Sequence, residues 1–363
     1  MAAGLADRIW FTREWGHVSG QTRQVNVRHW QRFGTSFKDR RCKLSIILTR
    51  TMENVIMPSL RGRFVRWLVR RVAAKGTTYV KPVSQQRQEM EDAIARIKVS
   101  KKVSVQPVVA AGIPGEWIIP KKNMGKRTLL YCHGGGYFKG SLATHRAFMA
   151  HLALLLEAQV FHFAYRLAPE HPFPAAVEDG LAVYRWLLST PMDSKSIIIA
   201  GESAGGNLVL TTLLGARHAG LPLPAAAVCI SPHFDFSFSQ PAIRDNAESE
   251  VLYTLEELKW MRGIYLGPKA DDERLWRHDM VSPLFADLSG LPPLLLHADS
   301  TEMLRDDAVA MASRASAAGV VVELKVWRGL FHAFHLFTMI PEAKRALAEI
   351  RIFAEKYWRV LNS

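Results

Sequence analysis

Residues 196–207 read SIIIAGESAGGN, and this stretch decides the fold class of the 363-residue chain. Its first five residues are an apolar run typical of a buried β-strand, and a helical pattern follows over residues 206–216. Residues 201–205 have the G-x-S-x-G spacing of a sharp strand-to-helix turn, in which glycines allow close packing and the serine hydroxyl is exposed. The stretch therefore predicts a nucleophilic Ser203, followed by the amide of Ala204 at a helix N-terminus.

Strand-like and helix-like segments alternate on both sides of this turn, from about residue 103 onwards. The expected strands are 103–109, 116–119, 128–132, 159–164, 196–200, 225–230, 294–298 and 321–326. The helical patterns between the later strands cover 143–157, 175–190, 205–217, 303–318 and 341–360. Because continuous apolar strands alternate with helices, the sequence predicts an α/β fold with a mostly parallel eight-stranded sheet that helices cover on both faces.

The region before this alternation divides into two parts. Residues 1–51 are polar, basic and aperiodic, and they are either an upstream extension or a genuine basic arm. Residues 52–102 contain two helical patterns, of which the first carries an apolar residue at every fourth position from Leu60 to Val72, among five arginines. We interpret these arginines as a solvated helix face, with a position near a membrane surface as the alternative.

A second region interrupts the alternation between the sixth and seventh strands. Residues 236–290 are rich in Trp, Tyr, Leu and charged side chains, and a connection of this length is usually a functional lid or cap. The sequence therefore predicts a catalytic domain over residues 103–363, with a helical cap built from this excursion and from the helices of residues 52–102.

The charge and the cysteines restrict the partners and the compartment. Residues 1–75 hold 16 Lys and Arg against 4 Asp and Glu, so they carry almost all of the net charge of +14. The rest of the chain is nearly neutral, which argues against a nucleic-acid partner. No apolar run reaches the roughly 18–20 residues of a membrane span, and charges interrupt the first residues, where a signal peptide would be apolar. Cys42, Cys132 and Cys229 show no metal-ligand spacing, and a cytoplasmic enzyme is expected.

A glycine run, His-Gly-Gly-Gly, occupies residues 133–136 directly after the third expected strand. Consecutive glycines let backbone amides converge on one atom, as an oxyanion hole requires. A phosphate-binding loop is the alternative, but the run lacks the Gly-Lys-Ser/Thr ending of such a loop. His133 ends a strand beside a glycine turn, and we interpret it as a structural residue and not as a base.

A serine nucleophile needs a base, and the base needs a carboxylate that orients it. His332 and His335 lie in the loop after the last strand, where this chain order expects the base, and His332 follows the strand more closely. The acid is expected at the end of strand 294–298, where Asp299 and Glu302 both qualify and two further acids fall inside the next helix. Spacing alone does not decide between Glu302 and Asp299.

Several further motifs occur in a fixed order along the chain. The whole set is His133-Gly134-Gly135-Gly136, Tyr165-Arg166-Leu167-Ala168-Pro169-Glu170, Pro174-Ala175-Ala176, Asp179, Gly201-Glu202-Ser203-Ala204-Gly205-Gly206-Asn207, Ser231-Pro232 and Gly290-Leu291-Pro292-Pro293. With this set the chain resembles the hormone-sensitive-lipase-like family of bacterial esterases. The resemblance covers roughly residues 57–360 and implies the α/β-hydrolase fold with a helical cap.

The resemblance also implies roles for individual residues. The family's acid-x-Leu-x-Asp run falls on Glu302, which gives a triad of Ser203, His332 and Glu302 with Asp299 as the alternative acid. The family's oxyanion-hole donors fall on the amides of Gly134, Gly135 and Ala204.

We therefore expect a carboxylic ester hydrolase that acts on short- to medium-chain acyl esters through an acyl-enzyme intermediate, without a metal or an organic cofactor. The alternatives are a lactone or amide hydrolase on the same triad and a catalytically silent ligand-binding receptor of the same fold. The expected partner is a small-molecule ester, with no nucleic acid and no integral membrane association. The family resemblance allows a homodimer.

Overall fold

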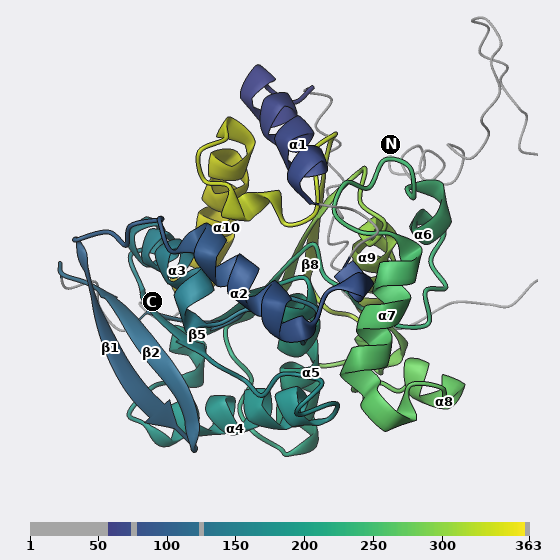
Figure 1. Ribbon diagram of the computed structural model, residues 1–363. Coiled ribbons are helices and arrows are strands. Elements are labelled where there is room, and N and C mark those ends of the chain that lie inside the picture. Colours follow the sequence, from purple (N-terminus) through teal and green to yellow (C-terminus); the bar gives the residue numbers. More distant parts are fainter. Residues whose placement is uncertain (1–56, 74–77, 123–126, 360–363) are drawn as a thin grey trace, which may run out of the picture. The chain divides into compact units, whose positions relative to one another are not determined.

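The eight expected strands form a single sheet in the computed structural model, which describes residues 57–73, 78–122 and 127–359 (Figure 1). The strands are β1 Val103–Ala110, β2 Ile113–Pro120, β3 Thr128–Cys132, β4 Gln159–Phe163, β5 Ile197–Glu202, β6 Ala226–Ile230, β7 Leu294–Asp299 and β8 Val322–Trp327. Their spatial order is β1-β2-β4-β3-β5-β6-β7-β8. Strand β2 pairs antiparallel with β1 and β4, and all other neighbours are parallel. The predicted fold class is confirmed, while residues 1–51 lie outside the described residues.

The first two strands run further than the sequence pattern indicates. Ala110 pairs with Ile113, so only two residues connect the strands. Both of them, Ala111 and Gly112, have positive φ values of 50° and 85°. A two-residue turn of this kind matches the twist of an antiparallel hairpin. An alanine is no turn signal, which is why the pattern alone places the strand ends too far apart.

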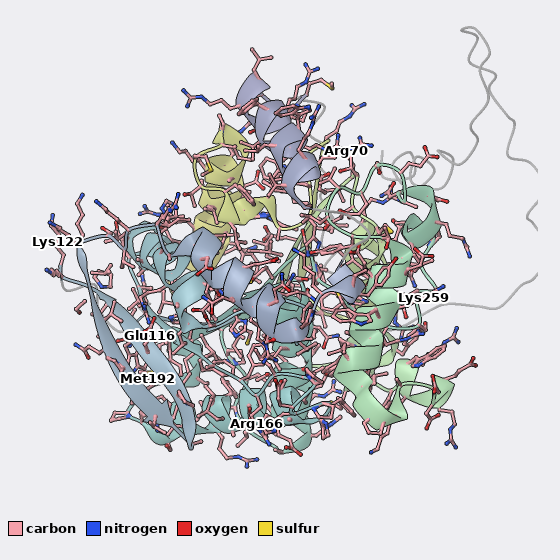
Figure 2. All side chains as sticks on the ribbon, viewed as in Figure 1. Arg70, Glu116, Lys122, Arg166, Met192 and Lys259 are labelled. Carbon is pink, nitrogen blue, oxygen red and sulfur yellow. The ribbon has the colours of Figure 1, made fainter. Side chains whose placement is uncertain are left out.

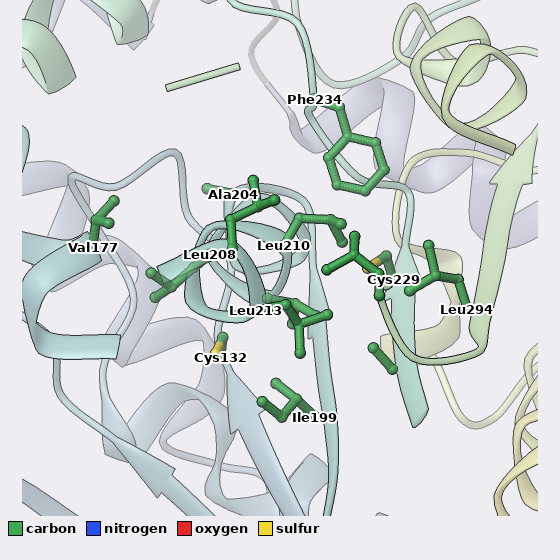
Figure 3. Packing of buried hydrophobic residues seen from close by; sticks show 14 of the residues in the cluster. Cys132, Val177, Ile199, Ala204, Leu208, Leu210, Leu213, Cys229, Phe234 and Leu294 are labelled. Carbon is green, nitrogen blue, oxygen red and sulfur yellow. The ribbon is translucent and has the colours of Figure 1, made fainter. Parts of the chain in front are cut away.

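Helices cover both faces of the sheet. They are α3 Leu142–Leu156, α4 Ala175–Ser189, α5 Ala204–His218, α9 Arg305–Ala317 and α10 Pro341–Arg359. Alternate strand residues face opposite layers, so Cys132 packs with α4, α5 and α9, whereas its neighbour Tyr131 packs with α3 and α10. Figure 3 shows the first of these layers, with Leu208 and Leu213 of α5 beside Ile199 of β5. The turn at Ser203 thus connects the central strand β5 to α5, a helix that is buried along most of its length.

Two separate regions supply the helices outside this core. The N-terminal region holds α1 Leu60–Val72, the short 3-10 helix η2 Thr78–Val80 and α2 Val83–Ile94. The excursion between β6 and β7 holds α6 Ala242–Asp245, α7 Leu255–Leu266, η4 Gly267–Lys269, α8 Glu273–Trp276 and η5 Pro283–Phe285. The remaining 3-10 helices are η3 Ser194–Ser196 and η6 Phe334–Leu336. Among the described residues, no helix is long and apolar enough to cross a membrane.

Candidate active site

Ser203 stands at the turn between β5 and α5 with a φ of 56° and a ψ of −122°. A positive φ strains the backbone of a non-glycine residue, and residues with such strain cluster at functional sites. Its amide donates to the carbonyl of Ile230 at 2.9 Å, which ties the turn to β6. A Cβ atom added at Gly205 would overlap the carbonyl oxygen of Cys132, so only glycine lets α5 approach β3 this closely. The turn therefore presents the Ser203 side chain to the cavity above the sheet.

His332 and Glu302 meet above the ends of β7 and β8. His332 Nδ1 lies 2.7 Å from Glu302 Oε2, and because a carboxylate only accepts, the imidazole carries its proton on Nδ1. Glu302 Oε1 accepts from the Ser231 hydroxyl at 3.0 Å and from the Asp299 amide at 2.6 Å. The carboxylate is fully buried, so these bonds fix both the acid and the ring that it holds.

Asp299, the alternative acid, has different partners. Its Oδ1 accepts from the amide and the hydroxyl of Thr301 at 2.9 and 2.7 Å, and its Oδ2 accepts from the Leu330 amide at 2.9 Å. Burial raises the pKa of this carboxyl to about 7 despite these hydrogen bonds. Asp299 therefore joins the two loops that carry Glu302 and His332, and its carboxylate makes no hydrogen bond with the imidazole.

The electrostatic environment of His332 suits a general base. Burial alone would lower the pKa of this imidazole, but the hydrogen bond and the attraction of Glu302 outweigh burial and raise the pKa above its ordinary value of 6.5. Its Nε2 is buried and has no hydrogen-bond partner among the described residues. The ring lines the same cavity as Ser203. The hydrogen bond between Ser203 Oγ and His332 Nε2 is therefore not formed in this structure. Such bonds between a nucleophile and its base are often long until substrate binds.

The glycine run after β3 differs from the expected set of oxyanion donors. The amide of Gly134 donates to the buried Oε1 of Glu202 at 2.5 Å, so it is not available to a substrate oxygen. We therefore remove Gly134 from the predicted donors. Among the described residues, the amides of Gly135, Gly136 and Ala204 donate to no protein acceptor, and all three residues line the cavity.

The buried carboxylate of Glu202 holds this glycine run in place through the Gly134 amide. His145 Nε2 lies 2.9 Å from the oxygen of Glu202 that accepts from the Gly134 amide. Burial alone would raise the pKa of Glu202, but the attraction of His145 and the hydrogen bonds lower it below its ordinary value. The carboxylate is therefore ionised at neutral pH and holds the loop through a charge-assisted hydrogen bond.

The other candidate histidines near the site have partners of their own. His133 Nδ1 lies 2.8 Å from the Gly134 carbonyl, and its ring stacks on Tyr165 at 4.2 Å. Burial lowers the pKa of His133 to about 3, so this ring is neutral. His335 Nε2 lies 3.0 Å from Nδ1 of His297 on β7. Neither His133 nor His335 lines the cavity that contains Ser203.

Sequence reasoning missed Tyr253, which precedes α7 in the excursion. Its ring meets the His332 imidazole edge to face at a centroid distance of 5.1 Å, and it lines the same cavity as Ser203. Glu250 holds this segment in place by accepting from the Met303 amide at 3.1 Å. Nothing in the local sequence marks these residues, because the excursion has no strand-helix context that would place them beside the triad.

The cavity above Ser203 has a volume of about 320 Å³ and a mainly apolar lining. The sheet side contributes the glycine run, Ser203, Ala204 and His332. The apolar lining includes Met90, Phe138, Leu252, Leu258, Met261, Leu304, Leu336 and Phe337. Both regions outside the core contribute to this lining, since Met90 lies on α2 and Met261 on α7. Among the described residues, no group of three or more His, Cys, Asp or Glu side chains could hold a metal ion.

Comparisons with known proteins agree with this geometry. A family model described as the alpha/beta hydrolase fold matches residues 129–336. An acetyl-hydrolase of Streptomyces hygroscopicus is 41% identical over 64% of this chain and 76% of its own, and an esterase of Acinetobacter venetianus is 38% identical over 69% and 82%. A crystal structure of an esterase from the bacterial hormone-sensitive lipase family superposes with a TM-score of 0.78, at 37% identity over 84% of this chain and all of that one. The chain therefore belongs to the α/β-hydrolase fold family and, within it, to the hormone-sensitive-lipase-like esterases.

Proposed function

We propose that this carboxylesterase hydrolyses short- to medium-chain acyl esters through an acyl-enzyme formed on Ser203. The observation that carries the proposal is the buried bond of 2.7 Å between His332 Nδ1 and Glu302 Oε2, which leaves Nε2 unpaired in the cavity that Ser203 lines. A serine, an imidazole and a carboxylate in this relation form the arrangement that activates a hydroxyl for acyl transfer.

In the first step, Ser203 Oγ attacks the ester carbonyl carbon while His332 Nε2 takes the hydroxyl proton. Glu302 keeps Nδ1 protonated and stabilises the imidazolium that forms. The oxyanion accepts hydrogen bonds from the amides of Gly135, Gly136 and Ala204, of which Gly136 replaces the Gly134 of the sequence-based set. Each such donor lowers the barrier by on the order of 3 kcal/mol.

The tetrahedral intermediate then collapses and the bond from carbon to the alcohol oxygen breaks. His332 gives its Nε2 proton to the leaving alcohol, and the acyl group remains on Ser203. Water enters, His332 removes its proton, and the resulting hydroxide attacks the acyl carbon. A second collapse returns the proton to Ser203 and releases the carboxylic acid, which restores the starting enzyme.

The size and lining of the cavity support the acyl range. A volume of about 320 Å³ is at the small end of ligand pockets, and its apolar side chains favour an uncharged acyl chain. One relative is named an acetyl-hydrolase, and one similar structure, 37% identical, was soaked with p-nitrophenyl butyrate. Both names point to short acyl groups.

A panel of p-nitrophenyl esters from acetate to palmitate tests the proposal on the wild type and on Ser203→Ala. We expect the highest kcat/KM between acetate and octanoate, and a loss of about 10⁶-fold in kcat for the variant. A preference for palmitate would contradict the acyl range. A folded wild type that hydrolyses anilides better than esters would contradict the ester assignment.

Three further points remain proposals. We propose that α1, α2 and the excursion 236–290 form the cap, because Met90 and Met261 line the cavity from the two sides. The homodimer and the cytoplasmic location expected from the sequence stay predictions.

A further inference from the structure

Helix α1 exposes an apolar face to solvent. Leu60, Phe64, Trp67 and Leu68 are 81%, 60%, 51% and 44% exposed, and their spacing places them on one side of the helix. A surface helix normally turns its apolar stripe toward the core. An exposed apolar face of this extent instead marks a surface that binds something.

The body of the protein holds α1 by its other side. Val65 and Val69 pack against the cluster that contains Phe331 and Phe334. The amide of Ser59, which caps the helix, donates to Glu342 of α10 at 2.7 Å. Figure 1 shows α1 beside α10. The apolar residues of α1 thus divide into a face that anchors the helix and a face that is left for another partner.

Arginines lie both beside and within the exposed apolar face, since Arg71 follows Trp67 by one turn, and the helix contains no acidic residue. Arg63 and Arg70 are two turns apart on the same side of the helix, and Arg70 is labelled in Figure 2. Together with Arg66 and Arg328 they line a cavity of about 460 Å³ beside the helix, and Trp67 lines it as well. Among the described residues, no carboxylate pairs with any of these four arginines. This surface is therefore suited to an anionic partner.

One arginine of this cavity has an unsatisfied polar atom. Arg66 donates from Nη2 to the carbonyl of Ser249 at 2.7 Å, but its Nε is buried and has no partner. A buried guanidinium N–H without an acceptor is costly, so this arginine gains from any movement that brings its Nε to an anionic oxygen. Phosphate oxygens suit the planar donor geometry of arginine.

We propose that α1 docks the protein onto an anionic lipid surface, with its exposed apolar face in the headgroup–acyl boundary and a lipid phosphate in the arginine-lined cavity. An amphipathic helix with aromatic and leucine residues on one face and arginines beside it is the type that lies in this boundary. Arg71 stacks on Trp67 at 4.9 Å, so its cation can reach the headgroups while the ring lies deeper.

Charge favours a lipid surface over the other occupants of this face. A second copy of the chain would bring two arginine-rich helices together without acids to neutralise them. Residues 1–56, which precede the helix, hold 10 Lys and Arg against 4 Asp and Glu and are themselves basic. An anionic membrane is complementary to both.

The position of α1 also connects docking to the catalytic cavity. Ala73, which caps the C-terminal end of α1, lines the cavity that contains Ser203 and His332. A membrane bound along α1 therefore lies next to one side of this cavity. Docking itself does not require catalysis, and it can be measured separately from hydrolysis.

Flotation of the full chain with vesicles tests the proposal. The vesicles are pure phosphatidylcholine or an equal mixture of phosphatidylcholine and phosphatidylglycerol. We expect the wild type to float with the mixed vesicles only, and less at high salt. Phe64→Glu/Leu68→Glu and, separately, Arg63→Gln/Arg70→Gln should each weaken binding by about tenfold or more.

The matched control is Ile352→Glu, which places an acid at a residue of α10 that is 68% exposed. It should bind like the wild type, and p-nitrophenyl butyrate hydrolysis should stay within about twofold in all variants, which shows that they fold. Equal binding to both vesicle types would overturn the proposal, as would mixed-vesicle binding that survives Phe64→Glu/Leu68→Glu. If the wild type binds neither vesicle type, the proposal fails. If it is then also a dimer that Phe64→Glu/Leu68→Glu abolishes, the face belongs to a second copy of the chain.

Discussion

Two buried carboxylates lie three residues apart, Asp299 at the end of β7 and Glu302 in the turn that follows, and they have different partners. Glu302 binds the imidazole of His332, whereas Asp299 binds the amides of Thr301 and Leu330. The difference arises from the turn that follows β7, which directs Glu302 inward above the sheet. We therefore propose Glu302 as the acid of the triad, while Asp299 joins the loops that carry Glu302 and His332.

Glu302→Gln and Asp299→Asn separate these two roles. We expect Glu302→Gln to lower kcat by about 10⁴-fold, because the amide favours the wrong tautomer of His332. Asp299→Asn should keep kcat within about tenfold but lower the free energy of unfolding by about 1–3 kcal/mol, because the amide group cannot accept all three hydrogen bonds. Ester kinetics and urea unfolding measure the two effects. An inactive Asp299→Asn of wild-type stability would reverse the assignment.

The raised pKa of His332 predicts the pH dependence of the enzyme. The imidazole must be neutral to act as a base, so kcat/KM should rise with pH through the pKa of the free enzyme. Because Glu302 raises this pKa, the acid limb should lie above pH 6.5 in the wild type. In Glu302→Gln the residual activity should have its acid limb at lower pH. A wild-type limb below pH 6.5 would show that Glu302 does not stabilise the imidazolium.

Chain order and local context selected Ser203 and His332 among the serines and histidines, and the structure places both in the lining of one cavity. They could not choose Glu302, because both acids follow the same strand and only the conformation of the turn distinguishes them. They also included Gly134, because a sequence does not show that the buried Glu202 takes its amide. Tyr253 had no signal at all, since its contact with His332 depends on how the excursion folds back.

At the scale of elements, the contact between β3, β5 and α5 depends on the glycines of the nucleophile turn. Any side chain at Gly205 would overlap the backbone of β3, and moving α5 away would displace Ser203 and Ala204 together. The sequence predicts this element well, because an apolar strand, a glycine turn and a helix are all local patterns. It predicts the hairpin of β1 and β2 less well, because Ala111 adopts a positive φ without being a turn residue.

Gly205→Ala and Gly263→Ala make a matched pair for this element. We expect Gly205→Ala to destabilise the fold by about 3 kcal/mol or more, because the added methyl group meets backbone that cannot move. Gly263 lies in α7 with nothing near its added Cβ, so Gly263→Ala should stabilise the protein by up to about 1 kcal/mol. Thermal and urea unfolding measure both. A Gly205→Ala protein as stable as the wild type would contradict the close approach of α5 and β3.

At the scale of the whole catalytic unit, two segments far apart in the sequence complete one cavity. Met90 comes from α2 and Met261 from α7, and both line the space above Ser203. The length of the excursion indicates a cap, but its sequence does not show which side chains point inward. Which side chains point inward depends on how the folded core positions both segments over the ends of the strands.

Met261→Ala tests whether this cavity sets the acyl range. Removing the side chain enlarges the cavity, so we expect the ratio of kcat/KM for p-nitrophenyl octanoate to that for butyrate to rise by about three- to tenfold. Met192→Ala is the control, because Met192 lies outside the cavity beside Thr128 of β3. It should leave the ratio unchanged. An equal ratio in both variants would show that the acyl chain binds elsewhere.

The most direct test of the central claim is to label the enzyme with an alkyl fluorophosphonate and to map the adduct by mass spectrometry. The serine oxygen displaces fluoride from phosphorus, so only an activated hydroxyl reacts. We predict one phosphonyl group per chain, on Ser203 in the peptide of residues 196–217, and loss of both label and hydrolysis in Ser203→Ala. Labelling at another residue, or hydrolysis that survives Ser203→Ala at the wild-type rate, would contradict the account.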